Sequence, residues 1–205
     1  MSKNPNGKSS DNPTYFDDPR FVAHLRDMAA AATAAADSLG PAIAQAAEMI
    51  RATVKRGGTL FFCGNGGSAA DAQHMATEYV VRYKKARRAI GAIALTTDTS
   101  ALTAIGNDFS FDQIFSRQVE ALCRPGDLLI LHTTSGNSAN LIQAADAARK
   151  KGVSTLALSA KGGGALATLV DHCIIVPTDR TDRAQEIQLN IQHSICEMID
   201  DEIAG

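Results

Sequence analysis

Residues 60–68 read LFFCGNGGS, a short apolar run followed directly by a turn rich in glycine. The same order returns at residues 128–138, which read LLILHTTSGNS, with hydroxyl side chains in place of most of the glycines. Each turn leads into an Ala-rich segment with helical character, so backbone N–H groups and hydroxyls gather at a helix N-terminus, where an anion is favoured. Two such turns in one small chain predict a phosphorylated ligand.

Apolar runs of strand length alternate with helical segments through most of the chain. We expect strands at residues 59–63, 90–95, 128–131, 155–158 and 173–176. We expect helices at residues 69–83, 101–105, 112–122, 139–151, 165–169 and 182–203. Short, continuously apolar strands separated by helices are typical of a parallel sheet that is covered on both faces. The sequence therefore predicts a doubly wound, five-stranded parallel α/β sandwich of the flavodoxin-like kind.

Two further helices are expected before the first strand, at residues 20–37 and 41–56. The Leu-Gly-Pro sequence at residues 39–41 separates them, and Pro41 suits the first turn of the second helix. We interpret the pair as an N-terminal helical extension. Residues 1–15 are polar and are expected to form a flexible tail, which leaves residues 16–205 as a single domain.

The composition is that of an ordinary globular protein. The chain has 205 residues, 45% of them hydrophobic and 20% charged, which is enough to bury a substantial core. Its net charge of −2 provides no general attraction for nucleic acid or acidic lipid, and no apolar stretch has the length of a membrane span or the pattern of a secretory signal. The four cysteines, at positions 63, 123, 173 and 196, form no CxxC pair, which indicates a reducing cytoplasm.

The first turn is a nominal match to the GxGxxA dinucleotide fingerprint, from Gly64 to Ala69. That fingerprint also requires an acidic residue about 20 positions further on, at the end of the next strand. The nearest candidate, Asp98, comes 34 positions after Gly64 (98 − 64), so a nicotinamide cofactor is disfavoured. The chain also lacks the GxxxxGKS/T motif of nucleoside triphosphatases.

The second turn carries four hydroxyls within six residues, on Thr133, Thr134, Ser135 and Ser138. The alternative is that these side chains cap the following helix, but one hydroxyl is enough for a cap. The surplus favours a phosphate monoester held by hydroxyls and successive amides. Because the carboxyl ends of parallel strands meet at one edge of a sheet, the loop at residues 96–99 is expected to join the same site.

His74, Glu78 and Arg82 follow the first turn at intervals of four residues, which places them on one face of the expected helix. The plainer interpretation is a Glu78–Arg82 ion pair on a solvated face, worth about a few tenths of a kcal/mol. The position of His74 and Glu78 relative to the phosphate turn favours a catalytic role instead. His74 and Glu78 would lie roughly 9–15 Å along the helix axis from the phosphate turn, where the far end of a phosphorylated sugar would lie.

The last expected helix offers Gln185 and His193, eight residues apart and loosely on one face. An isolated His193 is most often structural, so a chemical role depends on its pairing with Glu78 across a shared cleft. A carboxylate and an imidazole together can move a proton between adjacent carbons through an enediol. The side chains of His74, Glu78, Gln185 and His193 could also hold zinc, although spacing alone does not establish a metal.

Four segments together resemble the phosphoheptose isomerase family of the sugar isomerase (SIS) domain group. They read CGNGGSAADAQHMATE at residues 63–78, LTTDTSALTAIGND at 95–108, TTSGNSAN at 133–140 and DRAQEIQLNIQH at 182–193. The resemblance runs in order over roughly residues 20–203. It implies a SIS-type fold and an aldose–ketose isomerase that converts sedoheptulose 7-phosphate to D-glycero-D-manno-heptose 7-phosphate. It also implies a homotetramer with sites at subunit boundaries, serving heptose synthesis for lipopolysaccharide or capsule.

The resemblance further implies roles for individual residues. Glu78 would be the general base and His193 the general acid. The phosphate would be held by the hydroxyls of Ser68, Thr133, Thr134, Ser135 and Ser138, with the turn at Gly66 and Gly67. The sugar would be contacted by Asn65, Arg82, Asp98, Asp182 and Gln185, with Thr97 beside Asp98. In the zinc-containing members the ligands correspond to His74, Glu78, Gln185 and His193.

Two positions depart from the family pattern. Many members carry His at the position of Gln188 and Ser at the position of Thr133. Neither change removes a catalytic group, but Gln188 is expected to alter the surroundings of any metal.

A non-catalytic alternative is a SIS-domain adaptor of the kind that associates with the bacterial replication initiator. Such adaptors share the phosphate turns but lack the glutamate that Glu78 matches, so Glu78 together with His193 favours the enzyme. A sugar-phosphate sensor of the transcriptional-regulator type would need an attached basic helix-turn-helix domain, which this sequence is not expected to contain. The expected partner is therefore a small sugar phosphate, with no nucleic acid and no membrane.

Overall fold

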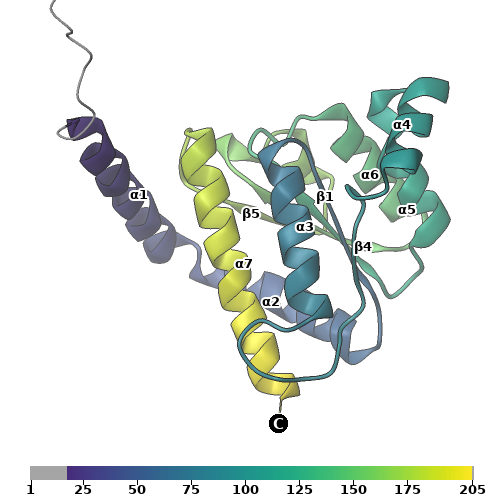
Figure 1. Cartoon of the computed structure of the whole chain (residues 1–205), viewed down its shortest axis with the longest axis horizontal. Helices are drawn as coiled ribbons and strands as arrows, with labels where there is room; N and C mark the ends of the chain where they lie inside the picture. Colours follow the sequence, from purple (N-terminus) through teal and green to yellow (C-terminus); the bar gives the residue numbers. More distant parts are fainter. Residues whose placement is uncertain (1–17, 205) are drawn as a thin grey trace, which may run out of the picture.

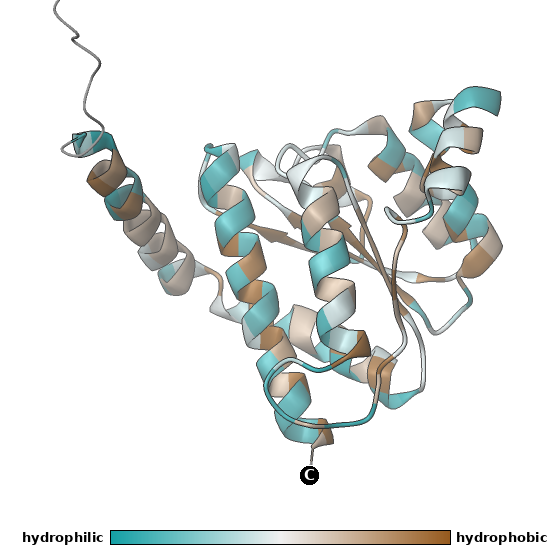
Figure 2. Cartoon of the chain, in the orientation of Figure 1, coloured by the Kyte–Doolittle hydropathy of each residue, from teal (hydrophilic) through white to brown (hydrophobic). Residues whose placement is uncertain are grey.

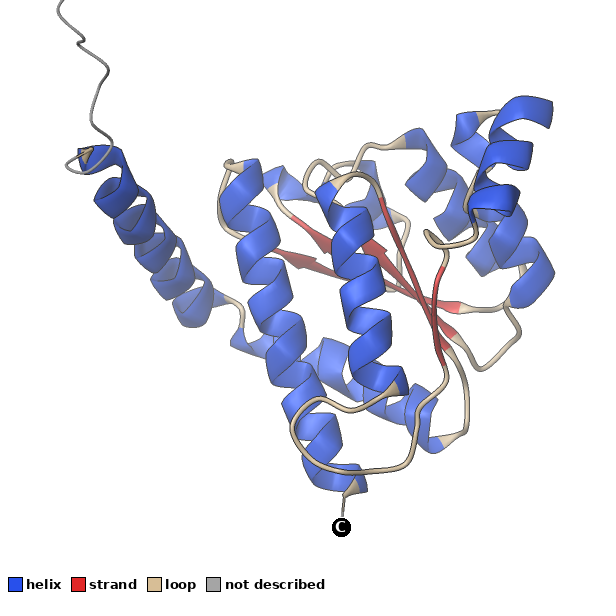
Figure 3. Cartoon of the chain, in the orientation of Figure 1, coloured by secondary structure: helices blue, strands red, loops and turns tan. Residues whose placement is uncertain are grey.

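The computed structural model describes residues 18–204 and contains a five-stranded sheet whose strands all run parallel (Figure 3). The strands are β1 (Leu60–Gly64), β2 (Ala92–Ala94), β3 (Leu128–His132), β4 (Ser154–Ser159) and β5 (His172–Ile175). Their order in the sheet is β2-β1-β3-β4-β5, which is the flavodoxin-like order. The predicted fold class is confirmed. The expected tail at residues 1–15 lies outside the described residues.

The helices largely follow the predicted segments. They are α1 (Pro19–Ser38), α2 (Gly40–Lys55), α3 (Gly67–Val80), α4 (Thr99–Asp108), α5 (Ser116–Leu122), α6 (Ala139–Lys150) and α7 (Thr181–Ile203). Short 3₁₀ helices occur as η2 (Phe111–Gln113), η3 (Lys161–Gly163) and η4 (Ala165–Thr168). The segment expected to form a helix at residues 165–169 is therefore only a 3₁₀ turn, because the glycines at 162, 163 and 164 all have positive φ and lead into it as an irregular loop.

Two further predictions of element ends are wrong. The helix expected to reach residue 83 ends at Val80, because Val81 leaves helical geometry with φ −90° and ψ −80°. Arg82 consequently lies in the following loop rather than on the helix face that carries His74 and Glu78. The strand expected at residues 90–95 is shortened to β2, an edge strand that pairs with β1 alone.

Two helical layers enclose the sheet, and successive strand residues point into different layers. Phe62 and Ile130 pack with residues of α2, α3 and α7 in one core, whereas Phe61 and Leu129 pack with α5 and α6 in the other. Figure 2 shows the hydrophobic strands lying between these layers. The central strands β1 and β3 are buried on both faces, so their sequences are mostly apolar without a polar–apolar alternation.

The two N-terminal helices have different positions. Helix α2 packs against the sheet and against α7, so it belongs to a covering layer. Helix α1 projects from the body, and its main contacts are with α2 and α7 (Figure 1). Its start is fixed by Asp18, which accepts a hydrogen bond from the Arg20 amide at 2.9 Å, and by Pro19 in the first turn. The predicted helical extension therefore consists of α1 alone.

The topology places a ligand site between β1 and β3. Helix α3 leaves β1 toward one face of the sheet, and α6 leaves β3 toward the other face. Adjacent strands whose connections diverge in this way open a crevice beyond their carboxyl ends, which is where ligands bind in such sheets. Both predicted phosphate turns occupy this position. Over residues 18–204, no helix is long and apolar enough to cross a membrane.

Candidate active site

The first turn is shaped by glycines at the start of α3. Gly66 precedes the helix with φ +58° and ψ −121°, a conformation that residues with a Cβ rarely adopt. At Gly67, a Cβ would lie 2.7 Å from Nε2 of Gln185, so a larger residue there would displace the end of the Gln185 side chain. The local sequence therefore brings the beginning of α3 against the Gln185 side chain of α7.

The two turns line one small cavity of about 180 Å³ at the crevice. Its lining residues are Asn65, Ser68, His132, Thr133, Thr134, Ser135, Ser138, Leu141, Thr181 and Gln185. None of them is a lysine or an arginine, and most offer a hydroxyl or an amide. The predicted convergence of the two turns is confirmed, and the lining suits a compact anion held by neutral donors.

Hydrogen bonds fix the shape of the cavity. The side chains of Asn65 and Asn140 exchange two hydrogen bonds of 2.9 and 2.8 Å, which join the first turn to α6. The hydroxyl of Thr133 accepts from the Gly136 amide at 3.1 Å. Ser138 begins α6, yet its side chain makes no capping hydrogen bond. Capping therefore does not account for the Ser138 hydroxyl, which is left available to a ligand.

Four predicted sugar-contacting residues do not line this cavity within one chain. Thr97 and Asp98 are exposed, with the Thr97 hydroxyl donating to the Ala94 carbonyl at 3.0 Å and Asp98 accepting from the Ala101 amide at 2.9 Å. Arg82 is also exposed and donates to the Lys84 carbonyl at 3.3 Å. No residue of the loop at 96–99 lines this cavity within the single chain, and the Asp98 side chain caps α4.

Asp182 is the fourth of these residues, at the start of α7. It forms ion pairs with Arg180 at 2.7 Å and with Arg183 at 3.1 Å. Hydrogen bonding from Arg180 lowers the pKa of Asp182 to about 2, so its carboxylate stays ionised. Sugar contact by these four residues remains a prediction that the single chain does not test.

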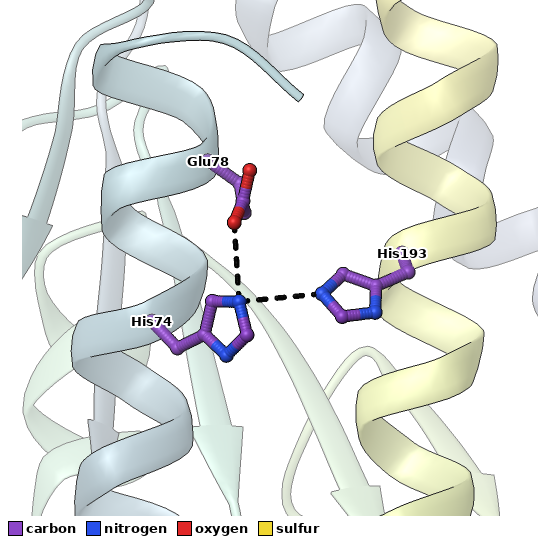
Figure 4. A group of neighbouring side chains, drawn as sticks. All are labelled: His74, Glu78 and His193. Atoms are coloured by element: carbon purple, nitrogen blue, oxygen red, sulfur yellow. Dashed lines mark hydrogen bonds and ion pairs between the residues drawn. The ribbon is translucent and has the colours of Figure 1, made fainter. Parts of the chain in front are cut away.

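The predicted acid/base residues lie together on α3 and α7 (Figure 4). Nε2 of His74 lies 3.1 Å from Oε1 of Glu78 and 3.4 Å from Nε2 of His193. Their ligand atoms all fall within 4.8 Å of one another. The pairing of Glu78 with His193, which the sequence hypothesis required, is therefore present within one chain.

The His193 imidazole is half-buried between aromatic neighbours. Burial lowers its pKa below the ordinary value, the adjacent His74 lowers it further, and Glu78 opposes both effects. The Tyr83 ring stacks on His193 with centroids 5.1 Å apart and an interplanar angle of 13°, and the His74 ring meets it edge-on at 5.0 Å. The geometry thus fixes the orientation of the His193 ring beside the Glu78 carboxylate.

The same three side chains suit a metal ion. Tetrahedral zinc with bonds of about 2.0–2.1 Å has ligand atoms about 3.3–3.4 Å apart, close to the two separations from His74 given above. Nε2 of His74 carries at most one hydrogen and so cannot make a full hydrogen bond to both neighbours at once, whereas a cation between the three atoms would satisfy them together. Gln185, the fourth predicted ligand, lies at Gly67 beside the cavity, about 12 Å along α7 from His193.

One functional candidate, His132, was not found from the sequence. His132 is fully buried beneath the turns, and neither ring nitrogen has a partner in hydrogen-bonding geometry within residues 18–204. A histidine that ends an apolar strand directly before a hydroxyl-rich turn could have indicated it. Gln188 donates to the Thr133 carbonyl at 2.7 Å, so it supports the second turn directly. The expectation that Gln188 alters the surroundings of any metal stays a prediction.

Comparison with known proteins gives a consistent result. A model of the SIS domain family matches residues 23–160. A protein of Rhodospirillum rubrum named phosphoheptose isomerase is 52% identical over 165 residues, which cover 80% of this chain and 88% of the relative. The solved phosphoheptose isomerase of Neisseria gonorrhoeae has a TM-score of 0.84 at 44% identity, over 89% of this chain and 97% of that one. For the Francisella tularensis phosphoheptose isomerase the TM-score is 0.86 at 36% identity, with the same coverage.

Proposed function

Because this chain belongs to the phosphoheptose isomerase family of SIS-domain enzymes, we propose that it converts sedoheptulose 7-phosphate to D-glycero-D-manno-heptose 7-phosphate. One observation carries the proposal beyond the family. A cavity lined by hydroxyls and amides shares the helices α3 and α7 with a carboxylate–imidazole group. A ligand held at the cavity by its phosphate would extend along these helices toward the proton-transfer residues.

The cavity binds the phosphate with neutral donors. Hydroxyls of Ser68, Thr134, Ser135 and Ser138 and the amides at the start of α3 would surround its oxygens, as anion sites at helix N-termini do. The side chain of Thr133 already accepts from Gly136, so its hydroxyl hydrogen is free to donate to the ligand. Asn65, held by Asn140, would contact the sugar next to the phosphate.

Glu78 and His193 carry out the proton transfer. The Glu78 carboxylate removes a proton from C1 of the open-chain ketose, which gives an enediol, and returns a proton to C2 to give the aldose. His193 supplies a proton to the oxygen on C2 and accepts the one leaving the oxygen on C1, so that the reaction is balanced. Burial lowers the pKa of His193, and an imidazole can both donate and accept a proton.

We propose that zinc binds to His74, Glu78 and His193; Gln185, the fourth predicted ligand, would have to turn away from Gly67 to complete the site. The support is that His74 lies 3.1 Å from Glu78 and 3.4 Å from His193, close to the ligand separations of tetrahedral zinc, with all three ligand atoms within 4.8 Å of one another. A bound zinc ion would supply Lewis-acid polarisation of the sugar carbonyl.

We also propose that the enzyme is a homotetramer in the reducing cytoplasm. Helix α1 exposes Phe21, Val22 and Leu25, of which Leu25 is 73% exposed, and Figure 2 shows hydrophobic segments along this projecting helix. Exposed apolar side chains on one element support contact with another subunit. All four cysteines are free, which suits a reducing compartment. The product would then serve heptose synthesis for lipopolysaccharide or capsule.

The test is incubation of the purified protein with sedoheptulose 7-phosphate while the aldose product is followed. Unphosphorylated sedoheptulose is the matched control, because it lacks only the group that the cavity is proposed to bind. We expect turnover of the phosphate and little turnover of the free sugar. Absence of aldose from the phosphorylated substrate would favour the adaptor alternative, and equal turnover of both sugars would remove the phosphate site from the mechanism.

A further inference from the structure

The loop at residues 81–91, which connects α3 to β2, is anchored by one buried carboxylate of α7. Figure 1 shows this connection passing across the C-terminal part of α7. Asp200 is fully buried, and its Oδ2 accepts the backbone amides of Tyr83, Lys84 and Lys85 at 3.1, 2.7 and 3.0 Å. A carboxylate that accepts several amides in this way fixes the path of the loop.

The same carboxylate holds a buried arginine that reaches the end of α3. Nε of Arg87 donates to Oδ1 of Asp200 at 2.5 Å, and both side chains are at most 1% exposed. The terminal nitrogens of Arg87 donate to the carbonyls of Glu78, at 2.8 Å, and Tyr79, at 2.9 Å, and also to the carbonyl of Arg88, at 2.9 Å. The carbonyls of Glu78 and Tyr79 lie in the last turn of α3, where no helical partner is available. Arg87 thus fixes the backbone of the proposed base.

The anchored loop also carries the ring that covers the proposed acid. Tyr83, whose amide is held by Asp200, stacks on His193 with the separation and angle given above. His193 and Asp200 are seven residues apart, so they lie on the same side of α7 two turns from each other. One buried ion pair therefore restrains the backbone of Glu78 and the ring packed on His193.

We propose that Tyr83 is a positioning residue of the isomerase, whose ring sets the plane of the His193 imidazole toward Glu78 while the Asp200–Arg87 pair holds the loop that presents it. The inference rests on the proposed acid role of His193. Without the stack, the imidazole could rotate about its side-chain bonds and lose alignment with the substrate. The phosphate cavity, which lies at the other end of α3, would be unaffected.

The test compares Tyr83→Ala with Tyr83→Phe, which keeps the ring and removes only the hydroxyl. Turnover of sedoheptulose 7-phosphate gives kcat and KM, and calorimetric titration with inorganic phosphate reports the cavity separately. We expect Tyr83→Ala to lower kcat by about 10- to 100-fold, the range for a misplaced catalytic group, with KM and phosphate affinity within about twofold. Tyr83→Phe should retain kcat within about twofold.

A second measurement does not depend on turnover. In protein labelled at the histidine ring carbons, the His193 resonances, assigned with His193→Gln, should be displaced by the ring current of Tyr83. The displacement should persist in Tyr83→Phe and vanish in Tyr83→Ala. An unchanged His193 spectrum in Tyr83→Ala, unchanged kcat in that variant, or equal loss in both variants would overturn the inference. An inactive wild-type protein would overturn the proposed function instead, while the spectra would still decide the stack.

Discussion

Acidification should destabilise the protein through His132, because this imidazole is buried in a neutral form. Burial lowers its pKa from an ordinary value of 6.5 to about 4, although the Gln192 side chain and the Ser68 backbone partly oppose the shift. The ring is 1% exposed, and its face meets Phe62 edge-on at 5.9 Å between ring centroids. Protonation therefore places a charge at a site that solvent does not reach.

The size and sign of the effect follow from the two pKa values. Between pH 6.5 and about 4 the unfolded chain binds more protons at this residue than the folded chain, so stability falls as the pH falls. A difference of about 2.5 units at about 1.4 kcal/mol each gives a loss of roughly 3 kcal/mol. The loss begins near the unfolded pKa and is complete below the folded one.

The assay is urea unfolding followed by circular dichroism at several pH values across this window, at one protein concentration. His132→Leu is the matched variant, since it removes the titrating group but keeps an apolar side chain in the site. We expect the free energy of unfolding of the wild type to fall by roughly 3 kcal/mol more than that of the variant over the window. Parallel pH profiles for the two proteins would refute the reasoning, because His132 would then contribute nothing to the acid sensitivity.

Three further predictions concern the anchor, the cavity and the metal. Asp200→Asn should lower the free energy of unfolding by about 3–5 kcal/mol, because it leaves Arg87 buried without a charge partner. In the same urea titrations, Asp201→Asn, which changes an exposed residue, should alter the free energy of unfolding by less than about 1 kcal/mol. Equal effects of the two substitutions would contradict the role of Asp200 as the anchor of the loop. Ser135→Ala should raise KM about tenfold with kcat nearly unchanged in steady-state assays; an unchanged KM would place the phosphate elsewhere. Elemental analysis of the dialysed wild-type protein should detect bound zinc, and the His74→Ala variant should bind zinc at least about tenfold more weakly. Equal zinc content in the two proteins would show that His74 is not a ligand.

The parts of the fold set by short-range sequence were predictable. Continuous apolar runs such as residues 128–131 are typical of strands covered on both faces, and Gly66 with its neighbours indicates a turn at a helix start. The i, i+4 relation of His74 and Glu78 follows from helical geometry alone, and the observed contact of 3.1 Å confirms it.

The remaining features depend on partners far along the chain. Helix α3 ends before Arg82 where residues 83–85 turn to meet Asp200, more than a hundred positions later, and nothing in residues 80–83 signals that contact. The proximity of Glu78 and His193 likewise depends on the packing of α3 against α7. Residue spacing made each of them a candidate, but the expectation that they act as a base and acid pair came from the family resemblance. The burial of His132, whose ring lies against Phe62, depends on the packing of distant elements at the strand end, which local sequence does not describe.

The central claim is that Glu78 moves the proton between the two carbons of a substrate held by its phosphate. The most direct measurement is the turnover of sedoheptulose 7-phosphate by Glu78→Gln, with inorganic phosphate affinity and the unfolding curve measured on the same preparation. We predict that kcat falls by about 10²–10⁴-fold, the range for loss of a general base, while phosphate binding and folding are retained. Turnover near the wild-type rate in a folded, phosphate-binding variant would contradict the account.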